Sequence, residues 1–422
     1  VPYQIPAYWA WVRLSDLYEI NPKVDAADDT EAAFIPMERI SPGFINDFTY
    51  ELQPWKKASL NHTKFRNGDV AFAKISPCFE NRKSFIADGL PNGIGGGTTE
   101  LIVLRQPLMC KEYTFLVVSD ERFIKECSAS YKGIVGQQRI KTNIVKNYYV
   151  PVPPVEEQRR IVESVKKVFQ EIDIIDEAQN RYSDDLKTLK SKIIDAGIHG
   201  QLTEQQPEDG NADDLYAQIQ EEKAALVKAG KIKKQKALPK IRDEEIPFEI
   251  PKNWKWVRLG DVVTIFGGKR IPAGRSLTSE NTGHKYIRVS EMKNRTVVTD
   301  GLLFVPEDIY PSISKYIINK KDVYITVAGT IGRVGKIPEE IDGANLTENA
   351  DRLVFKYIHQ DWLINCLDSR IVQRQIEMLT TQVAQPKLAI KRIQSFLIPL
   401  PPLPEQQRIA ARIDTILLAM KE

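Results

Sequence analysis

The 422-residue sequence is poor in residues that build disulfide and metal sites. Its four cysteines, Cys78, Cys110, Cys127 and Cys366, form no Cys-x-x-Cys pair, and its four histidines are scattered. These spacings argue against a disulfide framework and a zinc site, so reduced thiols are expected. No apolar run approaches the roughly 18–20 residues that span a bilayer, and no signal peptide begins the chain. We therefore expect a cytoplasmic protein with no metal and no membrane contact.

The sequence also lacks a strong charge of either sign, because its net charge is only +3. Bulk charge therefore cannot hold this protein on nucleic acid, since counterion release scales with the phosphates that are neutralised. Nucleic-acid binding would need basic residues concentrated on particular faces, or a partner that supplies the rest.

Recognisable catalytic motifs are missing as well. The glycines from Gly93 to Gly97 follow no βαβ entry, so they form no dinucleotide fingerprint. The segment from Gly332 to Lys336 lacks the glycine spacing of a phosphate loop and has Ile337 in place of Ser or Thr. Both are better interpreted as turns. There is no Gly-x-Ser-x-Gly elbow and no methyltransferase-like Asp/Asn-Pro-Pro-aromatic motif, so we expect no enzymatic activity in this chain alone.

What the sequence does contain is a long internal repeat. The entry from Tyr3 to Asp16, with Trp-x-Trp-Val-Arg-Leu at its centre, returns from Phe248 to Asp261. The proline block that runs from Val150 into Glu-Gln-Arg-Arg-Ile161 returns from Ile398 to Ile409. A period near 250 residues is far longer than the roughly 20–50 residues of solenoid units. It indicates tandem duplication of a whole domain.

Each copy is expected to be a mixed α/β domain with an irregular sheet. The entry predicts a strand that feeds a short helix, and short β-rich runs separated by turn residues follow, such as residues 69–75, 100–104, 322–327 and 351–355. The proline blocks cannot be helical and mark boundaries. We expect domains at residues 1–154 and 246–402, helices at 155–200 and 403–422, and a connector at 201–245.

A heptad pattern follows the first proline block. Its a and d positions are Ile161, Val165, Val168, Ile172, Ile175, Gln179, Tyr182, Leu186, Leu189, Ile193 and Ala196. This seam lasts about five heptads and predicts a helix of about 40 residues, roughly 60 Å long, that needs a partner helix. The second copy starts the same seam at Ile409 and stops after Met420. The partner for the distal half is therefore expected to be missing or supplied by another chain.

The connector has a basic run of lysines. Asp213 or Asp214 is expected to cap a helix that ends near Lys228. The lysines Lys228, Lys231, Lys233, Lys234, Lys236 and Lys240 follow. They are interpreted as a solvated linker or, alternatively, as an arm that contacts phosphates.

The duplicated entry and the Pro-x-Pro-Pro-x-x-Glu-Gln-x-Arg-Ile block with a heptad helix behind it resemble the specificity subunit of type I restriction-modification systems. The resemblance covers nearly the whole chain. It implies two target-recognition domains that read the halves of a bipartite double-stranded DNA target, separated by long antiparallel coiled-coil helices. It also implies two modification subunits, which bind S-adenosylmethionine and methylate adenine, and restriction subunits that cleave. The curtailed second helix departs from this pattern and puts the distal partner-binding surface in doubt.

Reading of bases favours Arg, Lys, Asn and Gln on ordered loops. The candidates are Lys64, Arg66, Arg82, Lys83, Gln137, Gln138 and Arg139 in the first copy, and Lys269, Arg270, Arg333, Lys336, Gln385, Lys387 and Arg392 in the second. Three pairs align between the copies, Lys83 with Lys336, Gln137 with Gln385 and Arg139 with Lys387. Equivalent positions suggest shared docking on the DNA backbone, and unmatched residues would provide specificity.

Two further motifs are expected to be structural. The tryptophans Trp9, Trp11, Trp254 and Trp256 are predicted core anchors, although they could stack on bases. The Glu-Gln pairs at 157–158 and 405–406 are predicted to open helices as first-turn carboxylates and capping groups. Two rival hypotheses remain open, a duplicated DNA- or protein-binding scaffold unrelated to modification and an enzyme of unrecognised type.

Overall fold

The computed structural model describes residues 3–106, 108–129, 131, 138–380 and 387–420. The chain divides into two compact units, Val1–Gln179 (unit 1) and Asn180–Glu422 (unit 2). Their boundary falls inside one long helix, α6 (Val155–Ile198). The predicted domain limits at residues 154, 200, 245 and 402 remain predictions, because a division into units by compactness does not test them.

Unit 1 contains two four-stranded sheets and a two-stranded ribbon. One sheet has the order β2-β9-β6-β7 and the other β4-β3-β8-β5, in which β3 and β8 are parallel. The ribbon pairs β1 with β10. The strands are β1 (Ala10–Arg13), β2 (Glu19–Ile20), β3 (Glu31–Ile35), β4 (Glu51–Pro54), β5 (Thr63–Arg66), β6 (Val70–Ala73), β7 (Ser84–Ile86), β8 (Ile94–Gly97), β9 (Leu101–Arg105) and β10 (Tyr149–Val152). The helices before α6 are α1 (Leu14–Leu17), α2 (Trp55–Ser59), α3 (Lys111–Ser119), α4 (Glu121–Ser128) and α5 (Thr142–Asn147).

Unit 2 repeats the two four-stranded sheets and the ribbon, and it adds one hairpin in which β14 pairs with β15. Its sheets have the orders β12-β21-β18-β19 and β16-β13-β20-β17, with β13 and β20 parallel, and its ribbon pairs β11 with β22. The strands are β11 (Lys255–Arg258), β12 (Thr264–Gly267), β13 (Lys285–Ile287), β14 (Met292–Lys293), β15 (Thr296–Val297), β16 (Leu303–Phe304), β17 (Ile317–Ile318), β18 (Val323–Thr326), β19 (Val334–Gly335), β20 (Ala344–Leu346), β21 (Ala350–Val354) and β22 (Leu397–Leu400). The helices are α7 (Ala212–Lys228), α8 (Leu259–Val262), α9 (Tyr310–Ile313), α10 (Gln360–Asp368), α11 (Arg370–Thr380), α12 (Ile390–Gln394) and α13 (Leu403–Ala419). The predicted internal repeat and mixed α/β class are confirmed.

The entry motif forms the predicted strand and short helix in both units. β1 runs directly into α1, and β11 runs directly into α8. The proline blocks supply β10 and β22, the strands that pair with the entry strands, and the next helix begins directly after the adjacent prolines Pro153-Pro154 or Pro401-Pro402. Proline is tolerated there because these two-stranded ribbons have free edges.

The glycines predicted to form a turn instead form strand β8. An added Cβ at Gly96 would lie 1.8 Å from the carbonyl oxygen of Ala58, and one at Gly95 would lie 2.3 Å from the ring of Phe65. Helix α2 and strand β5 therefore approach this backbone too closely for any side chain. The prediction of a turn at 93–97 holds for Gly93, whose φ is 70°, and was wrong for residues 94–97, where close packing requires glycine.

The Glu-Gln pairs are long-range links rather than helix caps. The indole N–H of Trp9 donates to Glu157 at 3.1 Å, and that of Trp254 donates to Glu405 at 2.8 Å. The buried amide of Gln158 accepts from Cys110 N, and that of Gln406 accepts from His359 N, each at 2.9 Å. The same contacts in both units tie the start of α6 or α13 to the entry motif and to the N-terminus of an earlier helix, α3 or α10. Glu157 and Glu405 lie in the first turn of their helices as predicted, but the capping prediction was wrong. Of the four tryptophans predicted as core anchors, Trp254 is buried, and the other three are only partly buried.

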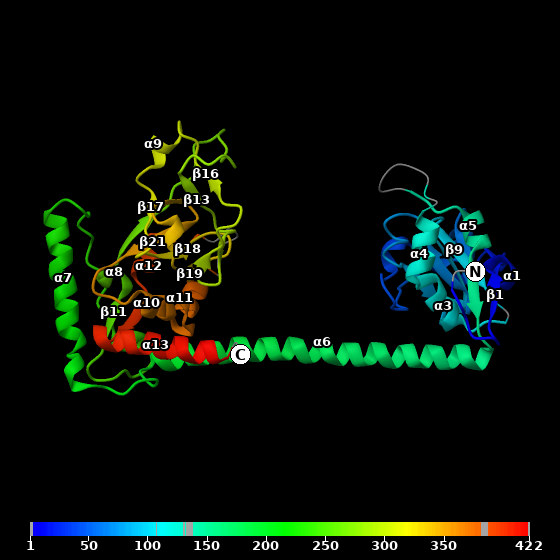
Figure 1. Ribbon diagram of the computed structural model, residues 1–422, viewed down its shortest axis with the longest axis horizontal. Helices are drawn as coiled ribbons and strands as arrows, with labels where there is room; N and C mark the ends of the chain where they lie inside the picture. Colours follow the sequence, from blue (N-terminus) through cyan, green and yellow to red (C-terminus); the bar gives the residue numbers. More distant parts are fainter. Residues whose placement is uncertain (1–2, 107, 130, 132–137, 381–386, 421–422) are drawn as a thin grey trace. The chain divides into compact units, whose positions relative to one another are not determined.

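Helix α6 is continuous for 44 residues, as the heptad pattern predicts. Its C-terminal end packs in unit 2 against α13, where an added Cβ at Gly197 would lie 2.8 Å from Ile413. Figure 1 shows α13 running alongside this end in the opposite direction. Further toward its N-terminus, the seam residues Ile172, Ile175 and Tyr182 are exposed. Among the described helices, none is long and apolar enough to cross a membrane.

The connector is part of the packed core of unit 2. Asn211, rather than Asp213 or Asp214, caps α7 by accepting from Asp214 N at 2.9 Å, so the predicted cap was two or three residues late. Leu215 and Ile219 of α7 are buried in the same hydrophobic cluster as Leu259. Figure 1 shows α7 standing beside α8 and β11.

Candidate nucleic-acid interface

In each unit, three loops meet at the end of the central strand of the first sheet. In unit 1, Lys74 follows β6, donates from its backbone N to Glu100 O at 2.8 Å and accepts from Ile140 N at 3.0 Å. In unit 2, Val327 follows β18, donates to Asn349 O at 2.7 Å and accepts from Leu388 N at 2.9 Å. The two main-chain patterns are the same because the two units share one frame, the pair of four-stranded sheets described above.

This main-chain pattern confirms that Arg139 and Lys387 occupy equivalent positions. Arg139 directly precedes Ile140, which donates to Lys74 O, and Lys387 directly precedes Leu388, which donates to Val327 O. Gln137 and Gln385 lie outside the described residues. Gln138 is described, and its carbonyl accepts from Ser76 N at 2.8 Å.

The other aligned pair, Lys83 with Lys336, was wrong. Ala73 ends β6 and donates to Lys83 O at 2.8 Å, whereas Thr326 ends β18 and donates to Arg333 O at 2.8 Å. The strand register therefore makes Arg333 the equivalent of Lys83. Alignment of the sequences missed this because the loop between β6 and β7 differs in length from the loop between β18 and β19.

Lys83 and Arg333 have similar roles in their units. Lys83 Nζ donates to Met37 O at 2.9 Å, and Arg333 Nη1 donates to Met292 O at 3.2 Å. Met37 follows the parallel strand β3, and Met292 begins β14, the strand that comes after β13. Each cation therefore holds the segment after the parallel strand against the first sheet. The guanidinium of Arg333 has five N–H donors, so most remain available for a ligand.

Arg139 is held by a carboxylate. Its Nη2 lies 2.7 Å from Glu100 Oε1, and its Nε lies 2.9 Å from Glu100 Oε2, a paired contact on the surface. This contact lowers the pKa of Glu100. No pattern in the sequence pointed to this pair, because 39 positions separate the two residues. Glu100 fixes the direction in which the guanidinium points, at a modest net energy for an exposed pair.

Unit 2 pairs different residues in the same region. Arg270 Nε lies 2.5 Å from Glu348, which precedes Asn349, the equivalent of Glu100. Lys269 Nζ lies 5.8 Å from the ring centre of Tyr316. Lys387 is exposed, and its amine makes no hydrogen bond or ion pair within the described residues. The cation arrangement thus differs between units that share one frame.

Asp351 is a buried carboxylate in this region that the sequence reasoning missed. It lies on β21, is 4% exposed, and its Oδ2 has no hydrogen-bond partner among the described residues. Burial raises its pKa to about 7, while the charge of Lys387 opposes the shift. By strand register its equivalent in unit 1 is Ile102, which is fully buried. The available signal was an aspartate in the second copy where the first copy has an isoleucine, Ile102.

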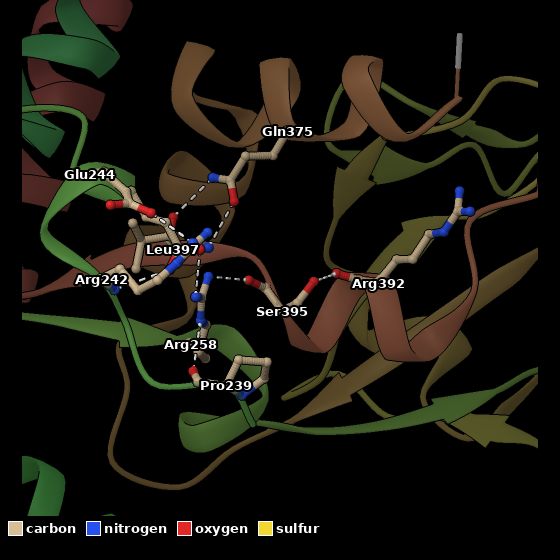
Figure 2. Close-up of polar contacts among 9 residues, drawn as sticks. Pro239, Arg242, Glu244, Arg258, Gln375, Arg392, Ser395 and Leu397 are labelled. Atoms are coloured by element: carbon tan, nitrogen blue, oxygen red, sulfur yellow. Dashed lines mark hydrogen bonds and ion pairs between the residues drawn. The ribbon is translucent and has the colours of Figure 1, made fainter. Parts of the chain in front are cut away.

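The remaining candidates lie in the second sheet or have side chains that bond to other residues of the protein. Lys64 and Arg66 belong to β5 in the second sheet, and Lys64 Nζ lies 5.9 Å from the ring centre of Trp55. Arg82 donates to Ser119 O at 2.9 Å and pairs with Glu121. Lys336 pairs with Asp361 at 2.6 Å. Arg392 donates to Leu379 O at 2.6 Å, and its side chain points away from Arg258 in Figure 2. No group of histidine, cysteine and acidic side chains suited to a metal ion occurs in the described part of the chain.

Comparison with known proteins gives one consistent result. The family described as type I restriction modification DNA specificity domain matches residues 6–181 and again residues 251–421. The EcoAI specificity subunit of a type I restriction enzyme from Escherichia coli is 31% identical, across 99% of this chain and 78% of that protein.

Two solved structures share the fold. A chain from work on complex assembly and conformational transition of the type I R-M system has a TM-score of 0.70 at 20% identity, covering 100% of this chain and 93% of that one. The crystal structure of the HsdS subunit from Thermoanaerobacter tengcongensis has a TM-score of 0.57 at 20% identity, covering 100% and 92%. Together with the duplicated topology, the family match and the relative of 31% identity show that this chain belongs to the specificity subunits of type I restriction-modification systems.

Proposed function

We propose that this chain recognises DNA for a type I restriction-modification complex, each unit reading one half of a bipartite target. The observation that supports this most directly is that one two-sheet frame occurs twice with different side chains at its loop junction. Arg139 with Glu100 in unit 1 corresponds to Lys387 with Asn349 in unit 2. A shared frame with different loops suits two readers of different base sequences.

The roles of the cations divide by position. Arg139 and Lys387 are equivalent, so they dock the two units on phosphates in the same way. Arg333 holds its loop through a single donor, and its remaining donors suit the paired acceptors of guanine. Gln137 and Gln385, next to these loops in the sequence, suit adenine. Base reading thus depends on the loops, and positioning depends on the frame.

The partners supply the chemistry. Two modification subunits bind S-adenosylmethionine and methylate adenine, restriction subunits cleave, and this chain itself is non-catalytic and acts in the cytoplasm. Helix α6 supports a role as a spacer, because 44 residues at 1.5 Å each give a length of about 66 Å. A stiff helix sets the number of base pairs between the two half-sites, and the bases in this gap stay unread.

The test separates the two half-sites. Replacing Gln137 by Ala is expected to weaken binding through one half-site by about 1–3 kcal/mol, and Arg333→Ala to weaken binding through the other, because each side chain is proposed to hydrogen-bond a base. Binding is measured by competition with duplexes in which either half-site is scrambled. Arg139→Lys is the control, because it keeps the charge of a proposed phosphate contact and should leave the preference for both half-sites unchanged. Equal losses of affinity at both half-sites from either variant would contradict the proposal.

A further inference from the structure

The connector contains a segment whose charge is not used inside the protein. Residues 228–240, here called the lysine strap, contain six lysines and no acidic residue. The lysines Lys228, Lys231, Lys233, Lys234, Lys236 and Lys240 are all exposed. Within the described residues none of their amines makes a hydrogen bond or an ion pair. Other cations of unit 2 do have partners, such as Lys356 with Glu222 at 3.0 Å and Arg295 with Asp368.

The strap is fixed to unit 2 at its first end by α7. Lys223 Nζ, near the end of this helix, donates to Gly260 O at 2.6 Å and to Val263 O at 3.2 Å. Gln220 Nε2 donates to Asp261 O at 2.8 Å. The helix closes with Gly230 at φ 66°, and Lys231 N returns to Leu226 O at 2.9 Å. The chain therefore leaves α7 in a defined direction.

The second end is fixed by Arg258 of the entry motif. Figure 2 shows its guanidinium between Pro239 and Ser395, and it donates to Pro239 O at 3.4 Å and Ser395 O at 3.1 Å. Its Nη2 also pairs with Glu245 at 2.7 Å. Leu238 packs against Gly260, because a Cβ added to this glycine would lie 3.0 Å from Cδ1 of Leu238. Both ends of the strap are thus held by the protein, although its amines face solvent.

Holding six like charges within thirteen residues costs free energy through mutual repulsion, unless a polyanion neutralises them. The ten residues from 231 to 240 span at most about 33–36 Å when extended. That reach is comparable to one turn of B-DNA, about 34 Å. Lysine is a point charge on a long stem, suited to phosphates and unsuited to reading paired base acceptors.

We propose that the lysine strap is a sequence-independent binding site for DNA phosphates, outside the bases that unit 2 reads. This inference rests on the proposed function, because it assumes that unit 2 is on DNA. It adds a second mode of contact to that unit, which contributes affinity and association rate but no choice of sequence. An acidic protein surface is the competing occupant.

The test replaces Lys231, Lys233, Lys234 and Lys236 by Gln in the full chain, with Arg at the same four positions as the matched control. Binding of a fluorescein-labelled duplex is measured against salt concentration, with the target sequence and with a scrambled one. Each phosphate contact contributes about 0.9 to the slope of log K against log salt, so the Gln variant is expected to lose about 2–4 from the slope. The loss should be equal on both duplexes, and the Arg variant should keep the wild-type slope.

The outcomes separate the two proposals. An unchanged slope in the Gln variant overturns the strap proposal, as does a loss confined to the target duplex. If DNA binding is unchanged but co-purification with the modification subunits fails, the strap binds protein, and the proposal is likewise overturned. If wild type does not prefer target to scrambled duplex, the proposed function fails, yet the slope still tests the strap. Protection of α7 amides from hydrogen exchange checks that both variants are folded.

Discussion

Asp351 should make the free energy of unfolding of unit 2 fall as pH rises from 3.8 to about 7. Its carboxylate is 4% exposed on β21, and its pKa is raised from 3.8 to about 7. Between pH 3.8 and about pH 7, the folded state holds a proton on Asp351 that the unfolded state has released. The folded protein therefore binds more protons, and its free energy of unfolding decreases with increasing pH. This sign is opposite to that of a salt-bridged aspartate.

The magnitude follows from the size of the shift. Each tenfold change in an ionisation constant corresponds to about 1.36 kcal/mol, so a pKa raised to about 7 costs the folded state on the order of 4 kcal/mol above pH 7. Between pH 5 and pH 7 alone the expected loss is about 2–3 kcal/mol. Asp351→Asn cannot ionise and should lack this contribution. Asp351→Ile, which copies Ile102 of unit 1, should also be more stable than wild type at pH 8.

The assay compares wild type with Asp351→Asn by urea unfolding from pH 5 to pH 8, with hydrogen exchange of β18 and β21 amides to assign the change to unit 2. Asp300→Asn, at an exposed aspartate of the same unit, is the control. The difference between wild type and variant isolates the one carboxyl from all other titrating groups. Parallel pH profiles for wild type and Asp351→Asn, or a difference of opposite sign, would refute the reasoning.

Two other expectations concern the connector and the long helix. Arg258 lowers the pKa of Glu245 from 4.5 to about 2, so their contact stabilises the folded state above pH 4.5 and is lost as pH falls toward 2. Arg258→Met should remove this acid sensitivity and speed tryptic cleavage of residues 236–246 at neutral pH. An unchanged cleavage rate would contradict the role of Arg258 in fixing this segment. Insertion of one heptad into α6 adds about 10 Å, and should lengthen the unread gap of the target by about three base pairs. Methylome sequencing would read this out, and an unchanged gap would exclude α6 as the spacer.

Much of the architecture was predictable because it depends on local chemistry and on comparison of the chain with itself. The repeated Trp-x-Trp-Val-Arg-Leu entry predicted a strand and a short helix, and β1 with α1 and β11 with α8 are these elements. The spacing of apolar residues by threes and fours predicted α6, since that periodicity is a property of one helix alone. The prolines marked where each long helix begins, because proline cannot continue a helix interior.

The candidate site was predictable only in outline. Arg139 and Lys387 were aligned correctly because the distance to the proline block is the same in both copies. Lys83 was matched to the wrong residue, because its true equivalent, Arg333, is defined by hydrogen bonds between strands rather than by position in the sequence. Glu100 was missed as the partner of Arg139 because contact between them requires the sheet to bring distant segments together.

The amino-acid order alone was enough to establish that one domain occurs twice, where its helices begin and which side chains recur, since these follow from periodicity, backbone chemistry and repetition. Folding in three dimensions was needed to establish which cations are tied to carboxylates or carbonyls, that Asp351 is buried beside Lys387, and that the connector packs on unit 2 with its lysines left outward. The physical reason is that a side chain's partners, burial and pKa depend on segments far away in the chain. These segments become neighbours only through strand pairing and core packing.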